Sequence, residues 1–253
     1  IDMATASIPY LPYLSVAELH GNGFEINNFS WQAPTSNVGF IGHGYKSRLY
    51  DMTVNTAVYS GQSDSNYSIN AQHYVGALAG SFAYGEIEDS HAVLAGTVKG
   101  LAQVGGLVGA LASGPMGNVS VMKAVGVADA DAMVFGTGEY VGGIGGHLTS
   151  SLVMDLTTDV SVQGNSNYVG GAVGYLYGNA GYSQDYVTPG ASINIHSTGL
   201  TVTGAGQQVG GLFGYAIGGN GATNWSATAN VIGSSNYIGG LVGRLPTGTY
   251  SNL

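Results

Sequence analysis

A short glycine-rich motif recurs seven times along the chain, and this repetition restricts the possible folds more than any other feature. Its fullest form is Val104-Gly105-Gly106-Leu107-Val108-Gly109, and the copies start at Val38, Val75, Val104, Val141, Val169, Val209 and Ile238. Successive starts are 37, 29, 37, 28, 40 and 29 residues apart. A motif that returns at such intervals indicates stacked structural repeats, none of which can bury a core alone.

Each repeat also contains two further segments with the pattern of short strands. A Val-x-Gly segment, such as Val98-Lys99-Gly100 or Val202-Thr203-Gly204, precedes the next motif, and an alternating stretch such as Glu86–Ala92 lies between the two. Gly, Ser and Asn separate these segments, as expected between strands. We therefore predict an all-β fold, a parallel β-helix (β-solenoid) with about seven coils and three short strands per coil. Residues 19–253 are expected to form the solenoid, and residues 1–18 a cap or docking segment.

The composition supports a packed repeat structure. The 253 residues include 44 Gly, but Gly does not occupy every third position and there are only six Pro, which excludes collagen. Hydrophobic residues make up 44% of the chain and 17 residues are Tyr, which is unlike a disordered linker.

The motif itself departs from simple strand alternation. Its large apolar residues occupy the first and fourth positions, which a regular strand would place on opposite faces. A bend at the Gly pair would turn both Val104 and Leu107 inward. The eighth position is also expected to point inward and to form a ladder along the stack: Tyr45, Phe82, Leu111, Leu148, Leu176, Ala216 and Leu245.

These segments resemble the GLUG repeat. The resemblance lies in Val-Gly-Gly-Leu-Val-Gly followed by Gly85-Glu86-Ile87-Glu88-Asp89-Ser90-His91-Ala92 and Gly96-Thr97-Val98-Lys99-Gly100, and it covers roughly residues 19 to 245. It implies a right-handed parallel β-helix of the kind found in bacterial surface and secreted proteins, including adhesins. The His-Glu-x-x-His signature of the peptidases that carry such repeats does not occur, so that activity is not implied.

Charge and residue usage exclude several classes of function. Five basic residues against fourteen acidic ones give a net charge of −9, so a nucleic-acid partner is not expected. No apolar run is long enough for a membrane helix, and residues 1–20 lack the basic start of a signal peptide. Without Cys there is no thiolate metal site, and the six His do not recur at ligand spacing, so we expect no metal and no cofactor.

Carboxylates are few, and no spacing among them requires a catalytic pair. Those that lie near one another are Glu86 with Glu88 and Asp89, Asp129 with Asp131, and Asp155 with Asp159. A glycan-cleaving β-helix enzyme would need convergent acids, and a calcium site would need several oxygen ligands. We therefore predict a protein without catalytic activity, while calcium binding stays open.

Tyrosines and amides provide the candidate binding residues. The long segment after the fifth motif is expected to form a recognition loop, since Tyr gives rigid contact area and amides adapt their hydrogen bonds. Its candidate ligand-binding residues are Tyr175, Tyr177, Tyr182, Asp185 and Tyr186. The residue before each motif forms a column of Asn37, Tyr74, Gln103, Tyr140, Tyr168, Gln208 and Tyr237. We interpret this column as stacking between coils, with a binding stripe as the alternative.

The function expected from these observations is that of an extracellular or cell-surface adhesin. Scarce Lys, abundant Tyr, Asn, Ser and Thr, and the absence of Cys are typical of secreted bacterial surface proteins. The ligand would be a cell-surface glycan or protein. The alternatives are a subunit of an extracellular filament, a receptor-binding tip of a phage fibre and a polysaccharide-degrading β-helix enzyme. The open ends of a solenoid would also permit end-to-end self-association or docking to a larger assembly.

Overall fold

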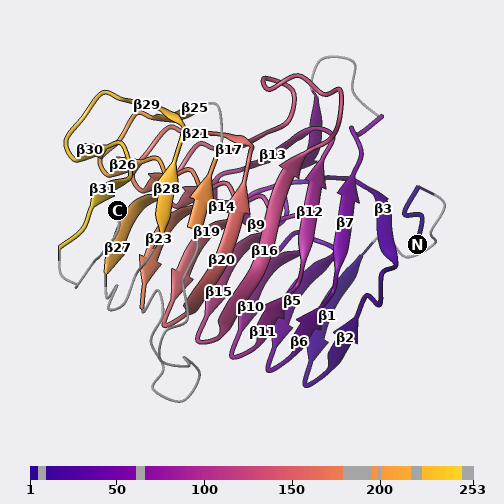
Figure 1. The fold of residues 1–253 in the computed structure, drawn as a ribbon. Helices are drawn as coiled ribbons and strands as arrows, with labels where there is room; N and C mark the ends of the chain where they lie inside the picture. The colour runs from indigo at the N-terminus through magenta and orange to yellow at the C-terminus, as the bar shows by residue number, and fades with distance from the viewer. Residues whose placement is uncertain (5–9, 61–65, 179–194, 199–200, 218–223, 247–253) are drawn as a thin grey trace.

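A computed structural model describes residues 1–4, 10–60, 66–178, 195–198, 201–217 and 224–246. Within these ranges the chain contains no helix, and its strands pair in parallel in four sheets. Figure 1 shows strands from successive parts of the chain following one another along the stack, from indigo at β1–β3 to yellow at β29–β31. Stacked parallel sheets of this kind are the arrangement of a β-solenoid, so the all-β class and the parallel stack are confirmed.

We number the sheets I to IV. Sheet I has eight strands: β1 (Leu11–Ser15), β5 (Ile41–Tyr45), β10 (Ala79–Ala83), β15 (Val108–Ala112), β19 (Gly145–Thr149), β23 (Val173–Tyr177), β27 (Phe213–Ile217) and β31 (Val242–Arg244). Sheet II has ten: β2 (Glu18–His20), β3 (Glu25–Phe29), β6 (Arg48–Tyr50), β7 (Thr53–Thr56), β11 (Glu86–Glu88), β12 (His91–Leu94), β16 (Pro115–Lys123), β20 (Leu152–Thr158), β24 (Ile195–Ser197) and β28 (Trp225–Ala227).

The two remaining sheets consist of strands of two to four residues. Sheet III has seven: β4 (Trp31–Gln32), β8 (Tyr67–Asn70), β13 (Thr97–Gly100), β17 (Met133–Gly136), β21 (Ser161–Gly164), β25 (Thr201–Gly204) and β29 (Asn230–Gly233). Sheet IV has six: β9 (His73–Val75), β14 (Ala102–Gly105), β18 (Val141–Gly142), β22 (Val169–Gly170), β26 (Val209–Gly210) and β30 (Ile238–Gly239).

One pass of the chain visits the sheets in a constant order. From Ala102 to Gly136 it runs through β14 in sheet IV, β15 in sheet I, β16 in sheet II and β17 in sheet III, and β18 then returns to sheet IV beside β14. The pass therefore crosses four sheets, whereas the sequence pattern predicted three strands. The difference arises in the motif, because the chain bends after its first Gly and the two halves of the motif enter sheets IV and I.

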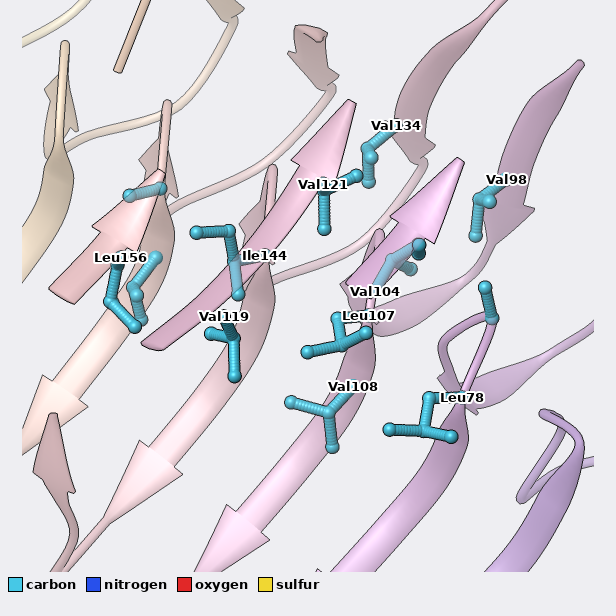
Figure 2. Packing of buried hydrophobic residues seen from close by; sticks show 14 of the residues in the cluster. Leu78, Val98, Val104, Leu107, Val108, Val119, Val121, Val134, Ile144 and Leu156 are labelled. Carbon is cyan, nitrogen blue, oxygen red and sulfur yellow. The ribbon is translucent and has the colours of Figure 1, made fainter. Parts of the chain in front are cut away.

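The bend places both large residues of the motif in the core, as predicted. Val104 and Leu107 are fully buried, and Ile144 in the next copy is buried as well. Figure 2 shows these side chains directed into the space that the sheets enclose, together with Val121 of sheet II and Val134 of sheet III. Side chains of the same motif position stack on one another in the core, since β14 and β18 pair Val104 with Val141.

The second residue of the motif is Gly in all seven copies because its surroundings leave no room for a side chain. A Cβ on Gly105 would lie 2.2 Å from the carbonyl oxygen of Val108 and 2.5 Å from that of Ile144. The first oxygen belongs to the same motif and the second to the next coil. The glycines thus permit the tight bend and the close stacking of coils.

The prediction for the eighth position is confirmed in the middle of the chain and is wrong at Tyr45. Phe82, Leu111, Leu148, Leu176 and Ala216 are buried and lie in one ladder. The first motif is one residue shorter, so Gly44 and not Tyr45 pairs with Phe82. The Phe82 ring occupies the space that Gly44 leaves, within 1.9 Å of where a Cβ would stand. The two residues compensate each other, and Tyr45 points outward.

Candidate ligand-binding face

The outer surface of sheet I carries one continuous column of side chains. The third residue of strands β10, β15, β19 and β23 faces outward, between buried neighbours. The strand register aligns these residues in the order Tyr13, His43, Ser81, Ala110, His147, Tyr175, Tyr215 and Arg244. We call this set the sheet I column. Its side chains are large at both ends and small at Ser81 and Ala110.

A second column lies beside it, at the residue before each motif. All seven members (Asn37, Tyr74, Gln103, Tyr140, Tyr168, Gln208 and Tyr237) have positive φ angles, between 52° and 67°. This left-handed conformation costs a non-glycine residue about 1–2 kcal/mol, whereas Gly adopts it freely. The same conformation recurs at the turn after sheet I, at Val16, Lys46, Tyr84, Ser113 and Ser150, so it is a general feature of the turns between sheets.

The two columns meet in a cluster of five aromatic rings. We define the aromatic face as Tyr140, His147, Tyr168, Tyr175 and Tyr215. Tyr140 stacks on His147 with ring centroids 4.5 Å apart and on Tyr168 at 5.0 Å, and Tyr175 stacks on Tyr215 at 5.1 Å. Edge contacts join these pairs, with Tyr168 and Tyr175 perpendicular to each other at 5.2 Å. Stacking between coils, which the sequence predicted for the corner column, is confirmed for Tyr140 and Tyr168.

Burial affects the ionisation of three members of the aromatic face. Burial lowers the pKa of His147, which keeps its imidazole neutral, and burial raises the pKa values of the Tyr140 and Tyr175 phenols. All five side chains are half-buried, so part of each ring reaches solvent. A surface of this kind offers apolar ring faces with hydroxyl groups at their edges, which suits ligands that are themselves part apolar and part polar.

A cation stands at one end of this surface. The Arg244 guanidinium lies 5.7 Å from the Tyr215 ring centroid and 5.0 Å from that of Tyr237. The geometry is that of a cation–π contact on an exposed site. Glu139, on the other side, accepts a hydrogen bond from Asn167 Nδ2 at 2.9 Å, next to Tyr140.

Two of the predicted ligand-binding residues lie in the described part of the chain. Tyr175 and Tyr177 both belong to strand β23, so the sequence-based placement of these two in a loop was wrong. The strand continues through them because Leu176 between them is buried and pairs with Leu148 and Ala216. Tyr175 belongs to the aromatic face, and Tyr177 is 50% exposed on the same side of the sheet. Tyr182, Asp185 and Tyr186 lie outside the described residues.

The aromatic face also contains residues that the sequence had not assigned to one site. Tyr140 and Tyr168 were recognised as a column and Tyr175 as a separate candidate, but their proximity was not foreseen. The signal was present in the spacing, because residues seven apart in the same coil, such as Tyr140 and His147 or Tyr168 and Tyr175, belong to the two columns. The chain bend at the Gly pair is what brings them together.

The carboxylates that the sequence drew attention to have partners within the fold. Glu86 accepts a hydrogen bond from the Tyr50 hydroxyl at 2.9 Å and lies 3.4 Å from Nε of Arg48. Burial and this hydrogen bond raise the pKa of Tyr50 to about 12. Burial, together with the charges of Glu86 and Asp89, raises the pKa of Glu88 to about 6.

One member of each of the other two acidic pairs contacts Lys123. Asp129 pairs with the Lys123 ammonium, and the Asp159 carboxylate accepts a hydrogen bond from the Lys123 amide at 2.7 Å. In the described ranges no three His, Asp or Glu side chains form a group that could hold a metal ion. The same ranges contain no helix that is long and apolar enough to cross a membrane.

Comparison of the chain with protein-family models, with curated proteins and with solved structures gave no match. A function for the chain is therefore inferred from the chemistry of the two columns.

Proposed function

We propose that this protein is a non-catalytic, extracellular adhesin-type module that binds a cell-surface glycan through the aromatic face. The observation that carries the proposal is the contact of five half-buried rings from three successive sheet I strands and the adjoining corner. Aromatic ring faces pack against the C–H faces of sugars, while the phenol hydroxyls bond to sugar hydroxyls.

The proposal includes finer features of the fold. We take the stack to be a right-handed β-helix with about seven coils, in line with the GLUG-like motif and its seven copies. A rigid stack suits adhesion because binding residues lie on paired strands and need little ordering when the ligand arrives.

A glycan array with neutral, sialylated and sulfated members tests this function with the full chain. Tyr175→Ala and Tyr215→Ala should each weaken binding about twofold to tenfold, the equivalent of an aromatic contact of about 0.5–1.5 kcal/mol. Tyr175→Phe should retain most of the affinity if the ring face carries the contact.

Tyr67→Ala is the matched control, since Tyr67 is also half-buried but belongs to sheet III. It should bind like the unmodified protein. Absence of any glycan ligand, or unchanged binding by both Tyr175→Ala and Tyr215→Ala, would contradict the proposal.

A further inference from the structure

The sheet I column is interrupted by small side chains, which open a groove next to the aromatic face. Ser81 and Ala110 occupy the column here, and Ala83 and Ala112 follow two residues later on the same strands, β10 and β15. The groove has a volume of about 610 Å³ and extends from His43 on β5 to His147 on β19. His147, at the far end of the groove, is also a member of the aromatic face.

A chain of hydrogen bonds defines the polar end of the groove. Ser81 Oγ donates to Asn37 Oδ1 at 2.7 Å and lies 2.6 Å from Nδ1 of His43. Because the single hydroxyl proton goes to Asn37, the serine oxygen must accept from His43, so Nδ1 of His43 carries a proton. Asn37 and His43 both line the groove and bring polar side-chain atoms to this end. The groove thus combines acceptor and donor groups at one end.

The lining also restricts the charge of a ligand. Among the described residues that line the groove there is no Asp, Glu, Lys or Arg. A carboxylate, sulfate or phosphate would lose part of its hydration there without meeting a Lys or Arg side chain, which is costly. Hydroxyl groups, which both donate and accept, match the groups that Asn37 and His43 present.

We infer that the groove is a second subsite, which binds the hydroxyl groups of an uncharged oligosaccharide whose other end lies on the aromatic face. This inference rests on the proposed function and specifies its ligand class. The ligand would run across the strands, from β5 to β27. Five strand spacings of about 4.8 Å make this path roughly 24 Å long, so the site accommodates a chain of several sugar rings and not a single one.

The test compares oligosaccharides of different length. Maltose-, cellulose-, mannan- and chitin-type hexasaccharides and the corresponding trisaccharides serve as probes, with affinity measured by calorimetry. For at least one series the hexasaccharide should bind about tenfold or more tightly than the trisaccharide, because it reaches both the groove and the aromatic face.

Two variants alter the groove at residues that are not members of the aromatic face. Ala110→Leu fills it from an outward position, and it should abolish the preference for the hexasaccharide while leaving trisaccharide binding unchanged. Ser81→Ala breaks the hydrogen-bond chain and should weaken hexasaccharide binding about threefold to tenfold. Thr203→Leu, an outward substitution on β25 of sheet III, is the control for added surface bulk.

The outcomes separate this inference from the proposed function. A hexasaccharide preference that survives Ala110→Leu overturns the groove subsite, whereas loss of binding in Tyr175→Ala would still support the aromatic face. Binding of sialylated or sulfated glycans alone likewise overturns the uncharged ligand class and leaves the adhesin function standing. Failure of every glycan to bind contradicts both.

Discussion

Replacing the second glycine of one motif by alanine should destabilise the protein strongly. In Gly105→Ala the new Cβ would stand 2.2 Å from the Val108 oxygen and 2.5 Å from the Ile144 oxygen, whereas real Cβ contacts stay above 3.0 Å. Neither oxygen is free to move. The Ile144 carbonyl accepts from the amides of Leu107 and Val108, both at 3.0 Å, and thereby holds two coils together.

The magnitude follows from these contacts. Forcing an extra carbon into a packed site costs about 1–3 kcal/mol. Weakening the two hydrogen bonds adds about 1 kcal/mol each. Alanine also lowers the conformational entropy of the unfolded chain, which offsets up to about 1 kcal/mol of this destabilisation. We therefore expect the free energy of unfolding to fall by about 2–5 kcal/mol.

Gly117→Ala is the matched control. Gly117 is also a buried strand glycine without a positive φ angle, but the nearest atom to its Cβ position is Cε of Met154 at 3.6 Å. This substitution should leave stability unchanged or raise it by up to about 1 kcal/mol. Urea unfolding followed by circular dichroism measures both variants. Equal midpoints for Gly105→Ala and Gly117→Ala would refute the reasoning that close backbone stacking requires the motif glycine.

Three further outcomes are expected. Leu107→Ala should lower the free energy of unfolding by about 2–5 kcal/mol, because Leu107 is fully buried, and Leu101→Ala, at a side chain that is 44% exposed, by less than about 1 kcal/mol in the same urea assay. The pKa of Glu88 is raised from 4.5 to about 6, which means that the fold disfavours the charged carboxylate. The contribution of the protonated carboxyl to stability is therefore complete below pH 4.5 and is lost as the pH rises through 6. Glu88→Gln should therefore raise the melting temperature at pH 7 and lose this advantage at pH 4.5, and an equal gain at both pH values in calorimetry would contradict the assignment. The raised pKa of Tyr50, about 12 against 10, makes the protein lose stability between those pH values, and the ultraviolet titration of Tyr50→Phe should lack one late-ionising phenol relative to the unmodified protein.

The repeat architecture could be predicted from the sequence because the motif positions have separate physical requirements. Val104 and Leu107 had to be buried, and the glycine between them had to allow a bend, so the inward direction of both was foreseen correctly. The number of sheets was not, since Val141–Gly142 and Gly145–Thr149 form two strands from what reads as one apolar segment. The apolar residues at the first and fourth positions indicated a bend, but a bulge within one strand and a break between two strands give the same pattern.

The candidate site was predictable only in part, because it depends on register between coils. Tyr175 was identified from its residue type, but its neighbours Tyr140 and Tyr215 lie 35 and 40 residues away in the sequence. The shortened first motif shows the same limit, since one missing residue exchanged the directions of Gly44 and Tyr45. Composition therefore located the aromatic residues, and only the structure assembled them into a face next to a groove.

The glycines of the motif also give the outward residues of sheet I a regular spacing. Because they let each coil lie at the spacing of a parallel sheet, about 4.8 Å, every coil contributes one residue to the sheet I column at a fixed interval. An internal duplication of one repeat would therefore lengthen this surface by one such step without disturbing the residues already in place. The reach of the protein along an extended ligand can thus change through the number of repeats, and its selectivity through single substitutions at the outward positions.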